Sequence, residues 1–127
     1  MGKMAAELTV QELEVYRTAT RLREQAQSEQ IDVRFEKAWA VARQAVSLLK
    51  EKYEIEKVWI FGSLLTRHRF HRQSDIDLAV WTLDDNSWLG AIGDLQEIDS
   101  DFRIEVVELV RATASIRQVV AEEGELL

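Results

Sequence analysis

The chain has 127 residues, 46% of them hydrophobic, no cysteine, and a formal net charge of −7. This length supports one hydrophobic core rather than two, and the missing cysteines exclude disulfides and thiolate metal sites. The acidic balance repels a nucleic-acid backbone, no stretch reaches the length of a membrane span, and no signal-peptide pattern is present. We therefore expect a single-domain cytoplasmic protein that binds neither a membrane nor nucleic acid directly.

Two helices are predicted before residue 55. Thr9 and Glu12 have the spacing of a capping box at the start of a first helix over residues 9–30. Asp32 is a candidate N-cap of the second helix, whose apolar residues recur at regular helical spacing. The thin apolar stripe of the first helix is Val15, Ala19, Leu22 and Ala26, and that of the second is Phe35, Ala38, Trp39, Ala42, Val46, Leu49 and Tyr53. The charged residues of the first helix are interpreted as a solvated face, with docking to a partner as the alternative.

A buried strand and a tight turn follow. Residues 58–61 are all apolar, which is typical of a buried strand. Gly62 permits a tight turn and a close approach of backbone that a side chain would block. Ser63 comes next, and if a short helix begins there, its free N–H groups and positive dipole end form an anion site to which the hydroxyl adds a ligand. This stretch predicts a phosphate-binding turn.

Two aspartates share one face of the next predicted strand. Because side chains alternate along a strand, Ile76, Leu78 and Val80 point to one face while Asp75 and Asp77 point to the other. Two like charges this close repel each other unless a cation lies between them, and carboxylate oxygens suit a Mg²⁺ ion that carries substrate phosphates. The pair is therefore a candidate magnesium site.

The segment between the turn and the aspartates is the most basic part of the chain. Residues 67–72 hold three arginines and two histidines. Arg67 and Arg72 are candidates for phosphate binding, because a guanidinium group can contact phosphate oxygens in a bidentate way. The alternative is an ordinary solvated loop. The histidines lack a third partner at ligand spacing, so we do not expect a zinc site.

A helix and a strand are predicted next. Residues 84–86 mark a turn with a plausible cap for a helix that runs to about Ile98. The following strand, residues 102–109, carries Glu105 and Glu108 on opposite faces, so only one of them can join the two aspartates.

The last predicted element is a helix. Thr113 or Ser115 can cap it, and Gly124 is its stop.

The order of these motifs resembles a known enzyme signature. Gly62-Ser63, eleven further residues and then Asp75-Ile76-Asp77 resemble the signature of nucleotidyltransferases of the DNA polymerase β superfamily. The small size is similar to the minimal nucleotidyltransferase (MNT) branch, whose members act as antitoxins paired with HEPN ribonuclease toxins. The resemblance covers roughly residues 55–124.

The expected fold class is α/β (α+β), with a nucleotidyltransferase core over residues 55–127 that contains a short mixed sheet backed by helices. Residues 1–54 are expected to form a helical hairpin packed on this core, so that the whole chain is one compact domain.

The resemblance also implies an activity and a partner. The expected reaction is Mg²⁺-dependent transfer of AMP from ATP to a tyrosine of a HEPN-type toxin, in a hetero-oligomer with that toxin. In the family a third acidic residue comes from the later strand, and Glu105 is the position that matches. The site residues expected on this resemblance are Asp75, Asp77 and Glu105 for catalysis and metal binding, and Gly62, Ser63, Arg67 and Arg72 for the nucleotide.

The sequence departs from the family pattern at three points. Glu105 replaces the usual aspartate, the spacer before Asp75 is one residue longer than is common in this branch, and Leu64 stands where many relatives carry a basic residue. These departures favour the alternative that the chain is catalytically weak or silent and neutralises its partner by binding alone. A small-molecule nucleotidyltransferase of the aminoglycoside-modifying type is a third possibility, but such enzymes carry a large additional helical domain that the sequence does not show.

Overall fold

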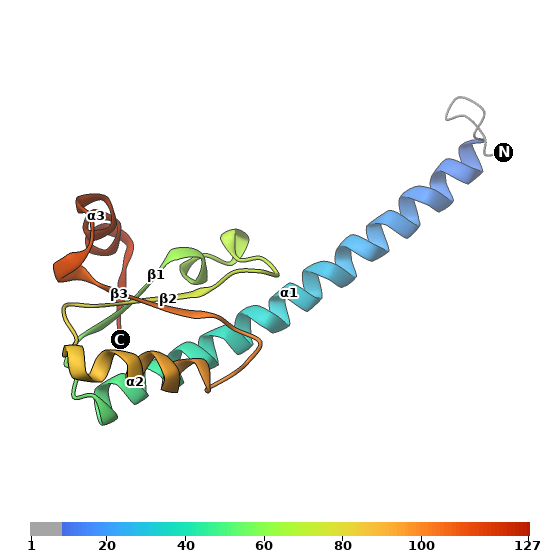
Figure 1. The fold of residues 1–127 in the computed structure, drawn as a ribbon. Coiled ribbons are helices and arrows are strands. Elements are labelled where there is room, and N and C mark those ends of the chain that lie inside the picture. The colour runs from blue at the N-terminus through green and yellow to red at the C-terminus, as the bar shows by residue number, and fades with distance from the viewer. Residues whose placement is uncertain (1–8) are drawn as a thin grey trace.

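The computed structural model describes residues 9–127 (Figure 1). In chain order, its helices and strands are α1 (Val10–Lys52), β1 (Val58–Phe61), β2 (Ile76–Val80), α2 (Asp85–Gln96), β3 (Ile104–Glu108), α3 (Ala114–Glu123) and β4 (Glu125–Leu126). Short 3₁₀ helices lie in the connections after β1 and after β3: η2 (Gly62–Leu65), η3 (Arg67–Arg69) and η4 (Leu109–Arg111). Residues 1–8 of the expected hairpin lie outside the described residues.

The predicted helical hairpin is wrong, because α1 is one continuous helix of 43 residues. Thr9 caps it as predicted, since its hydroxyl accepts a hydrogen bond from Glu12 N at 3.1 Å. Asp32 lies inside the helix and its carboxylate pairs with a loop arginine instead of capping a new helix. No glycine or proline interrupts this stretch, so nothing forces the backbone to stop. The two apolar patterns belong to different faces of the same helix.

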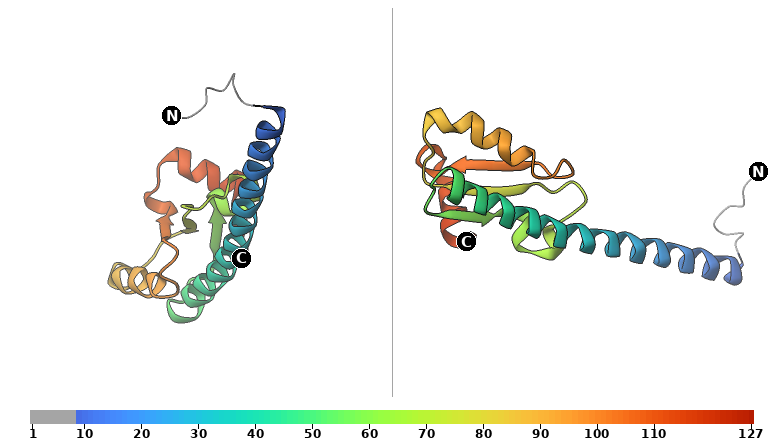
Figure 2. Two further views of the ribbon diagram at one scale, coloured as in Figure 1. Left: turned by 90° about the vertical axis from the view of Figure 1, so that its right-hand side faces the viewer. Right: turned by 90° about the horizontal axis from the view of Figure 1, so that it is seen from below.

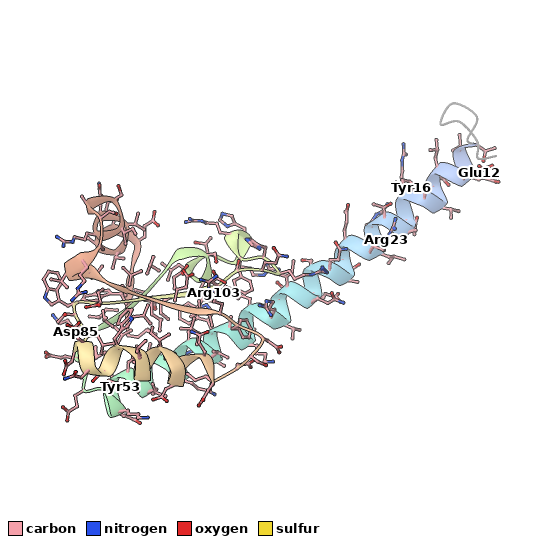
Figure 3. The ribbon with its side chains drawn as sticks, viewed as in Figure 1. Glu12, Tyr16, Arg23, Tyr53, Asp85 and Arg103 are labelled. Carbon is pink, nitrogen blue, oxygen red and sulfur yellow. The ribbon has the colours of Figure 1, made fainter. Side chains whose placement is uncertain are left out.

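Only the C-terminal half of α1 packs against the sheet. Its small side chains, including Ala38, Ala42 and Ala45, are fully buried and let the helix approach the sheet closely. By contrast, residues 21–30 are all exposed, and the helix extends away from the rest of the molecule (Figures 1 and 2). We call residues 10–30 the arm. Side chains such as Tyr16 and Arg23 stand clear of the body in Figure 3.

The sheet has four strands in the order β3-β2-β1-β4. β1 runs antiparallel to β2 and to β4, and β2 runs parallel to β3. Helices α1 and α2 cover one face, where Val58, Ile60, Leu78 and Leu95 are buried in the main core. Helix α3 lies on the other face. The predicted fold class, a mixed sheet backed by helices, is confirmed.

The remaining elements lie close to their predicted positions. Asp84 caps α2 through Asn86 N, Thr113 caps α3 through Ile116 N, and Gly124 ends α3. Within residues 9–127, no helix is both long enough and apolar enough to span a membrane.

Candidate functional site

The candidate site lies at the edge of the sheet where β1 ends and both β2 and β3 begin. The strand register pairs Asp77 with Phe61 on β1 and with Glu105 on β3. Paired residues of neighbouring strands share a face of the sheet, so Glu105 lies beside Asp77, on the face opposite α1. Asp75 stands immediately before β2. The structure thus brings the three predicted acidic residues to one edge.

Glu108 belongs to a different environment. It pairs with Val80 on the core-facing side of the register, and its carboxylate accepts hydrogen bonds from Thr82 Oγ1 and Leu83 N, both at 3.3 Å. These bonds fix the loop that follows β2. Alternation along β3 therefore separates Glu105, beside the aspartates, from Glu108, which holds a loop.

Two features of the turn require a glycine at position 62: the backbone conformation and the lack of room for a side chain. Its φ is +81°, in the region that side chains rarely adopt. A Cβ atom at this position would overlap Asp77 Oδ2 and lie 3.3 Å from Asp77 Cγ. The absent side chain therefore leaves the room that the Asp77 carboxylate occupies. The close approach predicted for this glycine is made to a side chain of the neighbouring strand.

The turn after β1 is shorter than an α-helix. Gly62 begins the four-residue 3₁₀ helix η2, in which Ser63 O accepts a hydrogen bond from Thr66 N at 3.3 Å. Trp39 of α1 anchors the turn, because its indole Nε1 donates to Leu64 O at 3.1 Å. Among the described residues, no group forms a hydrogen bond with the Ser63 hydroxyl. The hydroxyl is therefore available to a ligand at this edge.

The electrostatics of the site centre on Asp77. Burial, together with the negative charges of Glu105 and Asp75, raises the pKa of Asp77 from 3.8 to about 6. Within residues 9–127, neither Asp77 nor Asp75 has a hydrogen-bond donor or a cation as partner. Two unpaired carboxylates that repel each other form an oxygen donor set that fits a divalent cation such as Mg²⁺.

Glu105 differs from the two aspartates because it has a cationic partner. Arg103 lies two residues earlier, just before β3, and its guanidinium is 3.1 Å from Glu105 Oε1. In the described part of the chain, no three acidic or histidine side chains converge closely enough to form a ready-made metal site. Asp75, Asp77 and Glu105 therefore lie near one another, but their carboxylates do not converge on one point as the ligands of a bound ion would. Sequence reasoning overlooked Arg103, although its spacing from Glu105 was a signal for it.

Arg67 is engaged with α1 rather than with the acidic cluster. Its Nε lies 2.5 Å from Asp32 Oδ1, and its guanidinium also donates to Ser28 O at 3.2 Å. Arg67 therefore fastens the loop after β1 to the long helix. No sequence pattern indicates this contact, because Ser28 and Asp32 stand on either side of the expected break between two helices.

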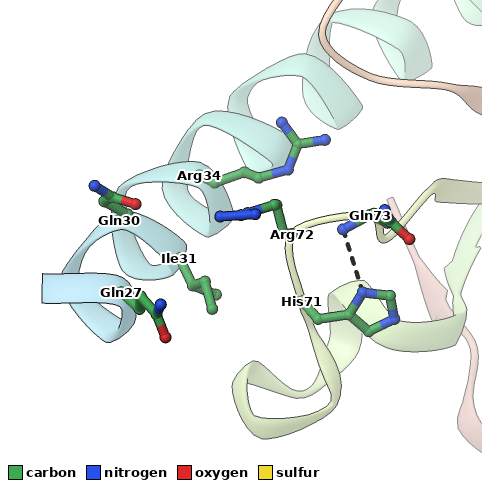
Figure 4. Close-up of a pocket in the computed structure, with 7 residues that line it drawn as sticks. All are labelled: Gln27, Gln30, Ile31, Arg34, His71, Arg72 and Gln73. Carbon is green, nitrogen blue, oxygen red and sulfur yellow. Dashed lines mark hydrogen bonds between the residues drawn. The ribbon is translucent and has the colours of Figure 1, made fainter. Parts of the chain in front are cut away.

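Arg72 lines a cleft between the same loop and α1 (Figure 4). The cleft has a volume of about 560 Å³. His71 is fixed in its wall, because its Nδ1 accepts a hydrogen bond from Gln73 N at 3.2 Å. The lining residues are Gln27, Gln30, Ile31, Arg34, His71, Arg72 and Gln73. The structure thus separates the predicted nucleotide-binding arginines from each other, one in a helix contact and one in this cleft.

Comparisons with known proteins agree with this geometry. The family model described as polymerase beta, nucleotidyltransferase, matches residues 43–127. No curated protein has a significantly similar sequence.

Several solved structures share the fold. A chain in a crystal structure of a toxin–antitoxin with AMP-PNP is 26% identical, with 65% of this chain and 69% of that chain covered and a TM-score of 0.53. A chain in a mutant of the toxin–antitoxin MntA–HpeT is 25% identical, with 67% and 70% covered and a TM-score of 0.54. A chain in the complex of the tri-AMPylated Shewanella oneidensis HEPN toxin with MNT antitoxin is 22% identical, with 70% of each chain covered and a TM-score of 0.51.

Proposed function

This chain belongs to the polymerase β nucleotidyltransferase family, and on that premise we propose that it is a Mg²⁺-dependent antitoxin that transfers AMP from ATP to a tyrosine of a HEPN-type ribonuclease toxin. The similar solved structures support this proposal, since one contains a toxin–antitoxin with AMP-PNP and another contains an AMPylated HEPN toxin with its MNT antitoxin. The predicted resemblance to this group of proteins is confirmed.

The observation that carries the proposal is the meeting of the glycine turn and the acidic residues at one sheet edge. Gly62 makes room for Asp77, and Asp77 lies beside Glu105 in the register. Two motifs separated by eleven residues in the sequence are thus adjacent in space. Nucleotidyl transfer needs such a meeting, because the polyphosphate must lie beside the carboxylates that hold its cation.

We assign metal binding to Asp75 and Asp77, with Glu105 as the third ligand once it leaves Arg103. Bound Mg²⁺ would neutralise charge on the phosphate oxygens and on the acceptor oxygen. The unpaired state of the two aspartates and the raised pKa of Asp77 support this assignment, because both describe negative charge that lacks a counterion.

The chain's own groups would position the reactants. The backbone of the turn at Gly62 and the free hydroxyl of Ser63 would bind the β and γ phosphates. The tyrosine oxygen of the acceptor then forms a bond to the α-phosphorus, the bond between the α-phosphorus and the bridging oxygen breaks, and pyrophosphate leaves. We assign the phenolic proton to Glu105. The protein contributes position and charge and forms no covalent intermediate.

A protein acceptor suits the open position of the site. The acidic cluster lies at a sheet edge, and no second domain encloses it within residues 9–127. The net charge of −7 complements a basic, RNA-binding toxin and disfavours RNA as the acceptor. An acceptor with its own folded surface would cover the open side of the site.

A second candidate function is neutralisation by binding alone. The observation that favours it is the pairing of Glu105 with Arg103, which leaves only two unpaired carboxylates. In that case the fold would inhibit the toxin by covering its ribonuclease site.

Intact-mass spectrometry separates the two functions. The protein is mixed with the toxin encoded by its neighbouring gene, ATP and Mg²⁺, and the toxin is expected to gain one or more AMP units on tyrosine. The matched control is the Asp75→Asn, Asp77→Asn double variant, which should transfer nothing. Inhibition of the toxin without any mass change, and to the same extent by the double variant, would establish occlusion and refute the transferase proposal.

A further inference from the structure

The arm carries an apolar stripe on a face of α1 that does not point to the core. At 100° per residue, this stripe is centred roughly 140° around the helix from the buried alanines of the packed half. Its two large members are strongly exposed, with Val15 at 70% and Leu22 at 61%. Ala19 and Ala26 continue the stripe and are also exposed. We call Val15, Ala19, Leu22 and Ala26 the back stripe.

The back stripe contains a hole that fits a side chain of another helix. An open groove of about 560 Å³ is lined by Gln11, Glu14, Val15, Thr18, Ala19 and Leu22. Val15, Thr18, Ala19 and Leu22 stand at positions i, i+3, i+4 and i+7, which is the arrangement of four residues that forms a hole for a knob in coiled-coil packing. The short side chain of Ala19 leaves room in this hole.

We propose that the back stripe binds the back stripe of a second copy of this chain, with the two arms antiparallel. In the register that we propose, Val15 faces the partner's Ala26, and Ala19 faces the partner's Leu22. The two-fold axis repeats both contacts. Each large side chain then meets an alanine, and Leu22 enters the hole over Ala19. The stripe is self-complementary in size, and none of its four residues is charged.

The charge distribution favours this face for self-association. The whole chain has a net charge of −7, so two copies repel each other over most of their surfaces. Residues 10–30 contain three arginines and four glutamates, which gives a net charge of −1. The arm is therefore a nearly neutral part of the chain, and in the proposed register the charged residues that lie opposite each other are Arg17 with the partner's Glu24 and Glu12 with the partner's Glu29.

The position of the arm leaves room for the partner. In the proposed register residue 11 of one copy lies opposite residue 30 of the other, so the overlap ends where α1 reaches its own body. Because the arms are antiparallel, the two bodies lie at opposite ends of the paired arms. The back stripe faces away from the sheet of its own body. The family match begins at residue 43, which places the stripe outside the catalytic fold.

The dimer is expected to be weak and to stabilise the arm. One helix of about 21 residues lies at the low end of a specific interface, so we expect a dissociation constant on the order of 1–100 μM. The arm packs no apolar face against the sheet in the monomer, so it lacks the tertiary contacts that stabilise most helices in proteins. Helicity of the arm should therefore increase with protein concentration.

Sedimentation equilibrium of the full chain across this concentration range tests the proposal. The parent should pass from monomer to dimer, and Leu22→Glu should weaken the dimer by about 100-fold or more, because the two-fold axis places two charges in apolar holes. The matched control is Leu89→Glu, since Leu89 is 82% exposed but lies on α2. This variant should dimerise like the parent. Circular dichroism checks that both variants are folded.

Cross-linking tests the orientation, because the chain has no cysteine of its own. Val15→Cys and Ala26→Cys chains, mixed and oxidised, should form a disulfide with each other. Each variant alone should not, since its two copies are offset by eleven residues, about 16 Å, which is too far for a disulfide.

Three results would overturn the proposal. A chain that stays monomeric at every concentration would show that the back stripe does not bind a second copy. The same conclusion would follow if the arm became protected from hydrogen exchange only after a toxin was added. A disulfide formed by Val15→Cys alone would show that the arms are parallel.

Discussion

Replacing Asp77 by asparagine should stabilise the metal-free protein at neutral pH. The pKa of Asp77 is raised to about 6 by burial and by the charges of Glu105 and Asp75. Between about pH 4 and 6 the folded protein holds a proton that the unfolded chain has lost, so stability from this group decreases as pH rises through that window. Above pH 6 the cost is fully present. An asparagine side chain at this position would carry no charge and would avoid the cost.

The size of the effect follows from the pKa. A rise from 3.8 to about 6 corresponds to about 3 kcal/mol. Asp77 is only partly buried, so solvent screening reduces this to about 1–2 kcal/mol. For a domain of this length, the melting temperature should rise by roughly 3–10 °C.

Urea denaturation in EDTA at pH 4 and at pH 7.5 measures the difference. The Asp77→Asn variant should match the parent at pH 4 and be more stable at pH 7.5. Mg²⁺ should then stabilise the parent and leave the variant unchanged. Glu108→Gln is the control, because its carboxylate accepts two hydrogen bonds and its loss should not stabilise the protein at either pH. Destabilisation of Asp77→Asn at pH 7.5, or an equal difference at both pH values, would refute the electrostatic reasoning.

Three further variants test the site. Gly62→Ala should lose about 1–3 kcal/mol in urea denaturation, because it strains the backbone and displaces Asp77; unchanged stability would contradict this contact. In the AMP-transfer assay Glu105→Gln should reduce kcat by about 100-fold or more while Glu108→Gln changes it little; the reverse ranking would place the wrong glutamate in the site. Arg67→Gln should lower the free energy of unfolding by at most about 1 kcal/mol and leave KM for ATP unchanged. A higher KM with unchanged stability would show that Arg67 binds the nucleotide.

The periodic parts of the sequence predicted the core of the fold. The apolar run over residues 58–61 is a strand in the structure. The alternation around Asp75 and Asp77 also agrees with the structure, because period-two burial leaves these two aspartates less buried than Ile76 and Leu78. The same alternation placed Glu105 and Glu108 on opposite faces, as the register shows. The roles of these residues in catalysis stay predictions.

Long-range contacts could not be predicted in the same way. The candidate N-cap at Asp32 predicted a break between two helices, but a helix continues through such a residue when no glycine or proline interrupts it. The pairing of Arg67 with Asp32 joins residues 35 positions apart and depends on how the loop lies against α1. The pairing of Arg103 with Glu105 is a different case, because residues two positions apart share a face of a strand and the sequence does carry that signal.

The close approach of Gly62 to Asp77 couples the residue types that the two positions can hold. A chain that gains a side chain at Gly62 must move Asp77, and a chain that loses Asp77 no longer needs the space beside it. The positive φ of Gly62 would still favour glycine or asparagine there. Among descendants of this fold, a bulkier residue in the turn should therefore accompany a shorter residue at the second aspartate. Under the proposed function, such paired replacements would mark chains that have lost nucleotide transfer and act by binding alone.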